Sequence, residues 1–264
     1  MGTPRLIRKV IDGTEYTYDQ SLDVIYVDRY DARGPLDRTQ VSSPVDLCLE
    51  VTQLCNMTCR NCFSNSANGR PAPSRPISSL TTDVMENANK VIRISVTGGE
   101  PLLHPDANKI LRLPARTEQI GFVITTNGTA RLDLDDVLAD YRWLVAVSLH
   151  GRQSVHDAYS RSTSFQVVAD RIRRLAPLTV VHIYSVLHDA MDVRDVHWLL
   201  QFRDEAGAAF LRFIEPRPFG RYQPLRQRRL VDEVQSALDE RSGLKMQPSL
   251  TFFHGVMEER RLSH

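Results

Sequence analysis

Residues 45–63 read VDLCLEVTQLCNMTCRNCF, and this stretch decides how the rest of the chain is interpreted. Its first half alternates apolar with other side chains, as a β-strand with one covered face does. Its second half carries Cys55, Cys59 and Cys62. The three thiols therefore follow a strand directly, on a loop at its C-terminal end. Barrels of parallel strands carry their chemistry at that edge, so we expect the loop to be a functional site.

Five further β-rich runs follow that strand, with stretches of helical spacing between them. The expected strands are residues 45–51, 92–97, 121–126, 144–149, 180–187 and 210–214. The clearest helices are expected over residues 165–175 and 193–206. Residues 69–79 contain three prolines and are expected to form a loop before a helix over 82–90. Alternating strands and helices predict the α/β class, as a partial (βα)6 TIM-like barrel with a short N-terminal hairpin and a C-terminal extension.

Three segments are expected along the chain: an N-terminal extension over 1–44, the barrel core over 45–216 and a C-terminal extension over 217–264. Asp12-Gly13 is a favoured two-residue turn, so strands 6–11 and 14–18 should pair as a hairpin that caps the barrel. The C-terminal extension opens with a basic, turn-rich run and then predicts a helix over 230–241.

The composition indicates no charged macromolecular partner. The chain has 264 residues, with 33 Lys and Arg against 32 Asp and Glu, so its net charge of +1 favours neither nucleic acid nor a membrane surface. The start lacks the apolar segment of a secretory signal, and no stretch approaches the roughly 18 apolar residues of a spanning helix. Three of the four cysteines lie within eight residues, unlike a disulfide framework. We therefore expect a cytoplasmic protein with a metal site.

The C-x₃-C-x₂-C spacing places three thiolates on one compact loop and supplies no fourth ligand. Thiolates are the natural ligands of iron–sulfur clusters, and three of them would leave one iron open. The alternative is a zinc site that takes Cys48 or a histidine as its fourth ligand. Structural zinc sites usually combine two pairs of ligands, so the spacing favours the iron–sulfur cluster.

This loop resembles the motif of the radical S-adenosylmethionine (SAM) superfamily, and VTQLCNMTCRNCF is similar to the subgroup of the molybdenum-cofactor cyclase and the peptide-maturing enzymes. The resemblance implies a [4Fe-4S] cluster on Cys55, Cys59 and Cys62, whose open iron binds the amino and carboxylate groups of SAM. It also implies cleavage of SAM to a 5′-deoxyadenosyl radical. One departure is Asn61, because an aromatic residue or histidine usually precedes the third cysteine.

Two strand ends extend the resemblance. The run Gly98-Gly99-Glu100 matches the GGE motif, whose backbone and glutamate region receive the methionine amino group of SAM. Asn127 ends the next strand, where relatives approach the cofactor. Its alternative role is that of a turn residue with positive φ.

Four later residues are further SAM contacts implied by the resemblance. Ser148 and Arg161 would meet the ribose and the carboxylate, and a guanidinium suits a carboxylate because it binds both oxygens. Val186 and Leu187 would contact adenine through backbone and apolar surface. The alternatives are a polar residue filling the barrel for Ser148, a solvated charge for Arg161 and ordinary core positions for the other two.

Strand alternation suggests which side chains face substrate. Helices should cover the face with Leu47, Leu49 and Val51, so the opposite, inner face of that strand should meet substrate. The candidates are Asp46, Cys48, Glu50, His150, His182, Tyr184 and either Arg212 or Glu215. Among them, Cys48, Glu50, His150 and Tyr184 are the candidate catalytic residues. Free cysteines are usually buried, so simple packing is the expected role of Cys48 and hydrogen-atom donation is its alternative.

No cysteine follows Cys62, whereas related enzymes carry C-terminal cysteines that bind further clusters. We therefore expect one cluster and a small-molecule substrate, such as a sugar, nucleoside or amino-acid derivative, in specialised biosynthesis. A peptide substrate is the first alternative, and a non-enzymatic iron–sulfur or zinc protein is the second. The peptide alternative would use a basic set to guide an acidic substrate: Arg217, Arg221, Arg226, Arg228 and Arg229. The expected partner is an external one-electron reductant such as flavodoxin or ferredoxin.

Overall fold

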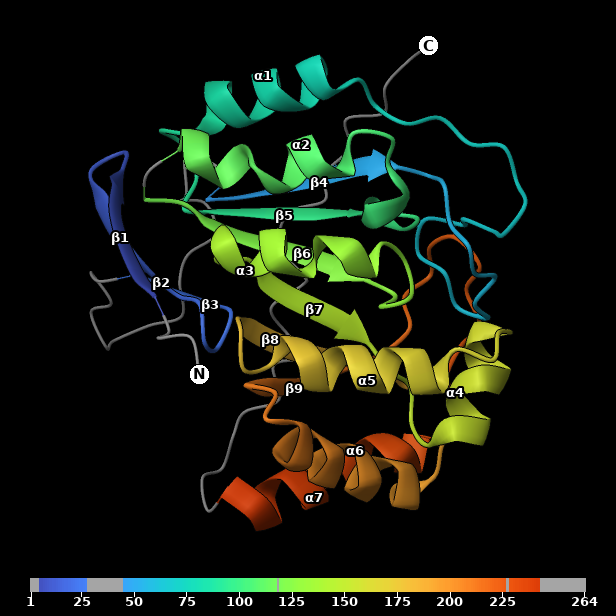
Figure 1. Cartoon of the computed structure of the whole chain (residues 1–264). Helices are drawn as coiled ribbons and strands as arrows, with labels where there is room; N and C mark the ends of the chain where they lie inside the picture. The colour runs from blue at the N-terminus through green and yellow to red at the C-terminus, as the bar shows by residue number, and fades with distance from the viewer. Residues whose placement is uncertain (1–4, 28–44, 118, 227, 243–264) are drawn as a thin grey trace.

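The chain is built on a six-stranded parallel sheet whose strands follow one another in chain order (Figure 1). The computed structural model describes residues 5–27, 45–117, 119–226 and 228–242. The strands of the sheet are β4 (Asp46–Thr52), β5 (Arg93–Gly98), β6 (Gly121–Thr126), β7 (Leu144–Ser148), β8 (Val180–Val186) and β9 (Phe210–Ile214). The predicted partial TIM-like barrel is confirmed. Each predicted strand is present, with ends that differ from the expected ones by at most one residue.

Helices follow the strands and cover one face of the sheet (Figure 1). They are α1 (Ile77–Asn87), α2 (Ala107–Leu111), α3 (Asp135–Asp140), α4 (Gln153–Ser160), α5 (Phe165–Leu175), α6 (Val193–Ala206) and α7 (Arg228–Ser242), with short 3-10 turns at Pro101–Leu103, Leu113–Arg116 and Leu132–Leu134. The predicted bounds of α5 and α6 are confirmed. The predicted start of α1 was wrong, because the helix begins directly after Pro76, at a position where proline is tolerated.

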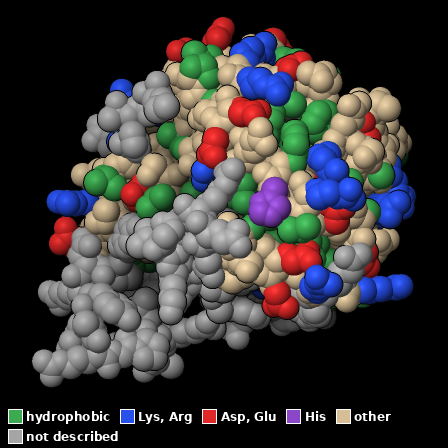
Figure 2. Space-filling model, turned by 90° about the horizontal axis from the view of Figure 1, so that it is seen from below, with side chains coloured by type: hydrophobic (Ala, Val, Ile, Leu, Met, Phe, Trp, Pro, Cys, Tyr) green, Lys and Arg blue, Asp and Glu red, His purple; other side chains and the backbone are tan. Residues whose placement is uncertain are grey.

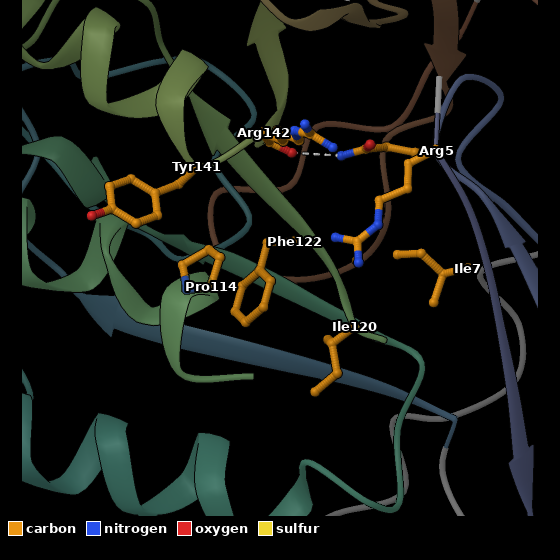
Figure 3. A pocket seen from close by; sticks show the side chains of 9 residues that line it. Arg5, Ile7, Pro114, Ile120, Phe122, Tyr141 and Arg142 are labelled. Carbon is orange, nitrogen blue, oxygen red and sulfur yellow. Dashed lines mark hydrogen bonds between the residues drawn. The ribbon is translucent and has the colours of Figure 1, made fainter. Parts of the chain in front are cut away.

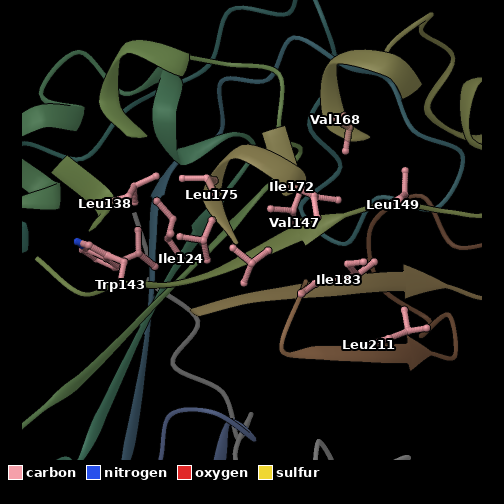
Figure 4. Packing of buried hydrophobic residues seen from close by; sticks show 14 of the residues in the cluster. Ile124, Leu138, Trp143, Val147, Leu149, Val168, Ile172, Leu175, Ile183 and Leu211 are labelled. Carbon is pink, nitrogen blue, oxygen red and sulfur yellow. The ribbon is translucent and has the colours of Figure 1, made fainter. Parts of the chain in front are cut away.

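The main hydrophobic core lies between the sheet and these helices. Leu49 and Val51 of β4 belong to it, as the predicted alternation required. Figure 4 shows Ile124, Val147 and Ile183 of three other strands in this core with side chains of α5. Trp143 is fully buried at its edge, where its indole N–H donates to the Leu111 carbonyl over 2.9 Å. The inner face is therefore the one left for chemistry.

A three-stranded antiparallel sheet lies against the inner face, at the end where the parallel strands begin (Figure 1). Its strands are β1 (Leu6–Ile11), β2 (Thr14–Asp19) and β3 (Val24–Val27). The predicted hairpin is thus confirmed, and β3 is an addition. Ile7, Ile11 and Tyr18 pack on Val123 and Leu144, forming a second, smaller core.

One charged residue anchors this cap. Asp23, which precedes β3, is 7% exposed and accepts hydrogen bonds from Arg93 Nη1 at 2.7 Å and from the hydroxyls of Tyr18 and Tyr184 at 3.0 Å each. Arg212 Nη1 lies 3.4 Å from its second oxygen. Burial alone would raise the pKa of Asp23, but Arg93 and then Arg212 outweigh it and lower that pKa. The carboxylate therefore closes this end of the barrel as an anion.

A small cavity of about 20 Å³ lies beside the cap, between Ile7 and Arg5 on one side and Phe122 and Tyr141 on the other (Figure 3). The Gln20 amide donates across it to the Arg142 carbonyl over 2.8 Å. Such a volume holds about one water molecule. Because it adjoins the cap and not the cysteines, it is a packing gap and not the candidate site.

The distribution of surface charge and the character of the helices bear on macromolecular and membrane contacts. Among the described residues on the face seen in Figure 2, acidic and basic side chains are interspersed. Among the described residues, no helix has both the length and the apolar character needed to span a membrane.

Candidate functional site

The cysteine loop, residues 53–66, follows β4 at the edge where the parallel strands end (Figure 1). Cys55, Cys59 and Cys62 are each partly buried. The backbone N–H of Met57 points at the Cys55 sulfur over 3.4 Å, and Cys62 Sγ lies 3.6 Å from the Ser64 hydroxyl. The buried Met57 side chain anchors the middle of the loop. The loop thus presents all three thiols at the C-terminal edge of the sheet.

The three thiols are close enough to influence one another. The pKa of Cys59 is raised to about 12, chiefly by burial and then by the neighbouring Cys55 and Cys62, while Arg221 opposes them. Burial likewise raises the pKa of Cys55, with contributions from Glu100 and Cys62. Free thiols at Cys55 and Cys59 therefore stay protonated at neutral pH. As thiolates, the three sulfurs would repel one another, and a cationic ligand that binds all of them would offset that repulsion.

The two glycines of the GGE motif let β5 approach the start of the cysteine loop. A Cβ at Gly98 would lie 2.3 Å from the Thr52 carbonyl oxygen, and one at Gly99 would lie 2.2 Å from that of Leu54. The backbone N–H of Gly99 donates to the Thr52 carbonyl over 2.7 Å. This close approach joins the end of β5 to the cysteine loop within the protein.

Glu100 is fully buried and connects its own segment to the end of β6. Its carboxylate accepts from the Leu102 N–H at 3.1 Å, the Thr126 hydroxyl at 2.8 Å and the Asn127 N–H at 2.7 Å. Burial raises the pKa of Glu100 against the effect of these bonds. The Glu100 side chain thus points to the end of β6. The backbone of Gly99 and Glu100 instead contacts the start of the cysteine loop.

Asn127 contacts the cysteine loop as well as its own turn. Its side-chain N–H group donates to Asn56 Oδ1 over 2.8 Å and lies 3.9 Å from Cys55 Sγ. The Asn56 amide in turn donates to the Thr129 hydroxyl over 2.9 Å. The positive φ expected as an alternative for Asn127 was wrong, since Gly128 takes it with φ of +79°. Asn127 therefore ties the end of β6 to the cysteine loop.

The four later SAM candidates lie at the same edge of the sheet. Ser148 ends β7 on the inner face beside Tyr184, and Val186 ends β8. Leu187 follows as a buried residue whose N–H donates to the Ile214 carbonyl. Arg161 is exposed and ends α4 in the left-handed conformation, with φ of +54°. The structure thus brings all four to the end of the sheet where the cysteine loop lies.

His150 supports this edge from inside. It is 5% exposed, and its Nδ1 accepts from the Val186 N–H over 3.1 Å. Its ring packs on Tyr159 with centroids 4.2 Å apart. The Tyr159 hydroxyl donates to the Asn61 carbonyl over 2.9 Å, which joins α4 to the cysteine loop. Burial holds the pKa of His150 well below its usual value, so the imidazole is neutral.

The inner-face candidates separate into two groups. Cys48 and Glu50 are exposed, so the expectation that Cys48 is a buried packing residue was wrong. The pKa of Cys48 is raised to about 11. The main cause is desolvation by the protein around the thiol, and the carboxylates of Asp46 and Glu50 add to it. The second group serves the N-terminal cap: Tyr184 and Arg212 contact Asp23, and His182 Nε2 lies 2.8 Å from the Ser21 carbonyl oxygen.

Several residues of the site and its support carried no sequence motif. Tyr159 and Arg221 contact the cysteine loop from segments far along the chain. Asp23 and Arg93 form the ionic centre of the cap. One signal was available for Arg93, because it lies on the same face as Asp46 and directly opposite it, in register. In the described part of the chain, no three His, Cys, Asp or Glu side chains, the three loop cysteines included, are already arranged around one metal position.

Two curated relatives match this chain at low identity. AlbA of Bacillus subtilis (strain 168), an antilisterial bacteriocin subtilosin biosynthesis protein, is 24% identical over 213 residues, covering 75% of this chain and 47% of AlbA. GTP 3′,8-cyclase of Chlorobaculum tepidum is 26% identical over 204 residues, covering 69% of this chain and 57% of the cyclase. The chain therefore spans about half the length of these relatives. They represent both subgroups that the cysteine motif indicated.

A solved structure shares the fold. The crystal structure of Streptococcus suis SuiB bound to S-adenosylmethionine superimposes with a TM-score of 0.63 at 19% identity, covering 76% of this chain and 49% of SuiB. The model of the Radical SAM superfamily matches residues 49–202, from β4 to α6. That match includes the three cysteines, the GGE motif and more than half of the chain. This chain therefore belongs to the radical SAM superfamily, whose cofactors are a [4Fe-4S] cluster and SAM.

Proposed function

We propose that this chain is a radical SAM enzyme that modifies a peptide, with its cluster on Cys55, Cys59 and Cys62. When bound, the cluster supplies the electron that breaks SAM into methionine and a 5′-deoxyadenosyl radical, which takes a hydrogen atom from substrate. The single observation that carries the proposal is the convergence of three partly buried thiols on one loop at the C-terminal edge of the sheet.

The surroundings of the thiols fit the cluster. Three neighbouring thiolates would repel one another, which suits a shared cationic ligand, and three thiols leave a fourth position to SAM. The Asn127 side chain beside Cys55 would orient this part of the loop. Glu100 would hold that asparagine through its backbone. These residues therefore position the cluster ligands and do not bind iron themselves.

SAM would lie across the ends of β5 to β8. We assign its methionine amino group to the backbone of Gly98 and Gly99, its carboxylate to Arg161 and its ribose to Ser148. Adenine would lie against Val186 and Leu187. The neutral His150 would fix the backbone of the adenine position, because its Nδ1 accepts from Val186. The support for these roles is their shared position at one edge of the sheet.

The substrate class is inferred from the comparisons. AlbA is named for bacteriocin biosynthesis, and SuiB has also been solved bound to its precursor peptide SuiA. These relatives favour a peptide as the substrate. The sequence alone had favoured a small metabolite, because no cysteine follows Cys62. A small substrate remains the second candidate, because the cyclase relative is named for GTP.

Two inner-face residues are proposed to meet the substrate radical. Cys48 and Glu50 are exposed on β4, the strand that leads into the cysteine loop. With a pKa of about 11, Cys48 is a protonated thiol at neutral pH, as a hydrogen-atom donor must be. Donation would leave a thiyl radical, which an electron from the external reductant and a proton from solvent would return to the thiol. Tyr184 would act differently, since its hydroxyl is already bonded to Asp23.

The function is tested with anaerobically reconstituted protein, dithionite and SAM, by measuring 5′-deoxyadenosine with and without candidate substrates. Deuterated peptides encoded beside the gene are compared with deuterated nucleosides, sugars and amino acids. We expect deuterium to enter 5′-deoxyadenosine from a peptide. Transfer only from a small metabolite would contradict the peptide assignment, and intact SAM in the presence of a reduced cluster would contradict the enzymatic one.

A further inference from the structure

The segment that leaves the barrel after β9 returns to the cysteine loop. Within it, residues 219–223, here called the clamp segment, run along the loop. The Arg221 N–H donates to the Cys62 carbonyl over 2.9 Å, and the two residues form an isolated antiparallel bridge. Gly220 makes this approach possible: it has φ of +59°, and a Cβ there would lie 2.1 Å from the Cys62 carbonyl oxygen. The contact is therefore between the two backbones.

The Arg221 side chain spans the loop. Its Nε donates to the Cys59 carbonyl over 3.0 Å, one terminal nitrogen donates to Asn65 Oδ1 over 3.3 Å, and the other donates to the Ser66 carbonyl. One guanidinium thus joins the second cysteine to the end of the loop. A lysine has the same charge but lacks the planar fork that makes three such bonds in fixed directions.

Asn61 completes the contact from the loop side. Its side-chain oxygen accepts from the Gln223 N–H over 2.9 Å, and its amide group lies 3.4 Å from the Gln223 carbonyl. Beside it, the rings of Phe63 and Phe219 pack edge to face, with centroids 5.4 Å apart. Asn61, the residue that departs from the usual motif, is therefore one of the loop residues that bind the clamp segment.

We propose that the clamp segment holds the cysteine loop in its ligating shape and that Arg221 is a positioning residue for the cluster. The inference rests on the proposed cluster assignment. Arg221 also places a positive charge beside Cys59. Reduction adds negative charge to a cluster, so a nearby cation raises its reduction potential. The residue thus has a geometric effect and an electrostatic effect, which different substitutions can separate.

The test uses Arg221→Ala, which removes both effects, and Arg221→Lys, which keeps the charge and loses the fork. Arg226→Ala is the matched control, because Arg226 is an exposed arginine that lies beyond the clamp segment. Circular dichroism first establishes that each variant is folded. Iron and sulfide are counted after anaerobic reconstitution, iron retention is titrated with a chelator, and the midpoint potential is measured by electron paramagnetic resonance.

We expect both Arg221 variants to release iron at a chelator concentration about tenfold to a hundredfold lower than the parent, the usual effect of losing a residue that supports a metal ligand. The potential should fall in Arg221→Ala and stay near the parent value in Arg221→Lys. Parent-like iron retention or an unchanged potential in Arg221→Ala would overturn the inference. A parent protein that binds no iron and sulfide would instead overturn the cluster assignment, and with it this inference.

Discussion

Replacing Asp23 with asparagine should destabilise the barrel from its N-terminal end. Asp23 has φ of +54°, a conformation that asparagine tolerates well, so the substitution removes charge with little effect on the backbone. The carboxylate accepts from Arg93 and two tyrosine hydroxyls and pairs with Arg212. Asparagine has one oxygen, so its amide group would face some of these donors.

The expected loss of stability depends on which hydrogen-bond partners Arg93 and Arg212 keep in Asp23→Asn. Removing one partner of a buried ion pair costs about 3–5 kcal/mol. Arg93 keeps two bonds to Asp46, at 3.0 and 2.5 Å, whereas Arg212 loses the one acidic partner described for it and its buried Nε already lacks an acceptor among the described residues. We therefore expect a loss of about 3 kcal/mol, near the lower limit, which lowers the melting temperature by roughly 6–12 °C.

The assay is urea and thermal unfolding of the parent and Asp23→Asn proteins between pH 3 and 8. The folded pKa of Asp23 is lowered, so its contribution is present above the unfolded value of about 3.9 and is lost as the pH falls through the folded pKa. The stability difference should thus be constant above about pH 5 and shrink under acid. Asp133→Asn, at an exposed ion pair with Arg131, is the control and should change nothing. A fully stable Asp23→Asn protein, or a difference that grows in acid, would refute the reasoning.

Three further predictions concern the site. Gly99→Ala should lower the free energy of unfolding by about 1–3 kcal/mol and reduce the iron content, because the new Cβ would clash with the Leu54 carbonyl. Urea unfolding and iron analysis measure the two effects, and parent-like values of both would contradict the prediction. Arg161→Ala and Ser148→Ala should weaken SAM binding in calorimetry, the first by about tenfold, while iron content is kept; unchanged affinity in both would remove them from the SAM site. Cys48→Ala should still form 5′-deoxyadenosine while the ratio of product to 5′-deoxyadenosine falls, and an unchanged ratio would end the hydrogen-donor assignment.

Most of the fold could be predicted because local pattern and global structure agree. The alternation of β4 places Leu49 under the helices and Cys48 on the inner face, and parallel pairing then carries the same parity from strand to strand. The start of α1 was missed because Pro76 was interpreted as loop, although a proline is compatible with the beginning of a helix. Cys48 was expected to be buried because most free cysteines are. That general tendency does not take into account that Cys48 lies on the face of β4 opposite the one that the helices cover.

The rest of the site depends on contacts that no local pattern records. The cysteines and the GGE motif are each contiguous, so their spacing revealed them. Arg221 acts on a loop 162 residues earlier in the chain, and Asp23 meets Tyr184 across 161 residues. The final position of such side chains depends on how separate segments pack, and from the sequence Arg221 was placed only in a basic set that would guide an acidic substrate. The sequence motif therefore identifies the ligands, and the structure adds the residues that hold them.

The most direct test of the account is the iron and sulfide content of the anaerobically reconstituted chain and of its four single Cys→Ala variants, with the electron paramagnetic resonance spectrum of the reduced protein. A cubane cluster on three thiolates predicts about four irons and four sulfides in the parent and in Cys48→Ala. Cys55→Ala, Cys59→Ala and Cys62→Ala should each lose the cluster and its spectrum. Stoichiometric zinc without sulfide in the parent, or loss of the cluster in Cys48→Ala, would contradict the three-cysteine assignment.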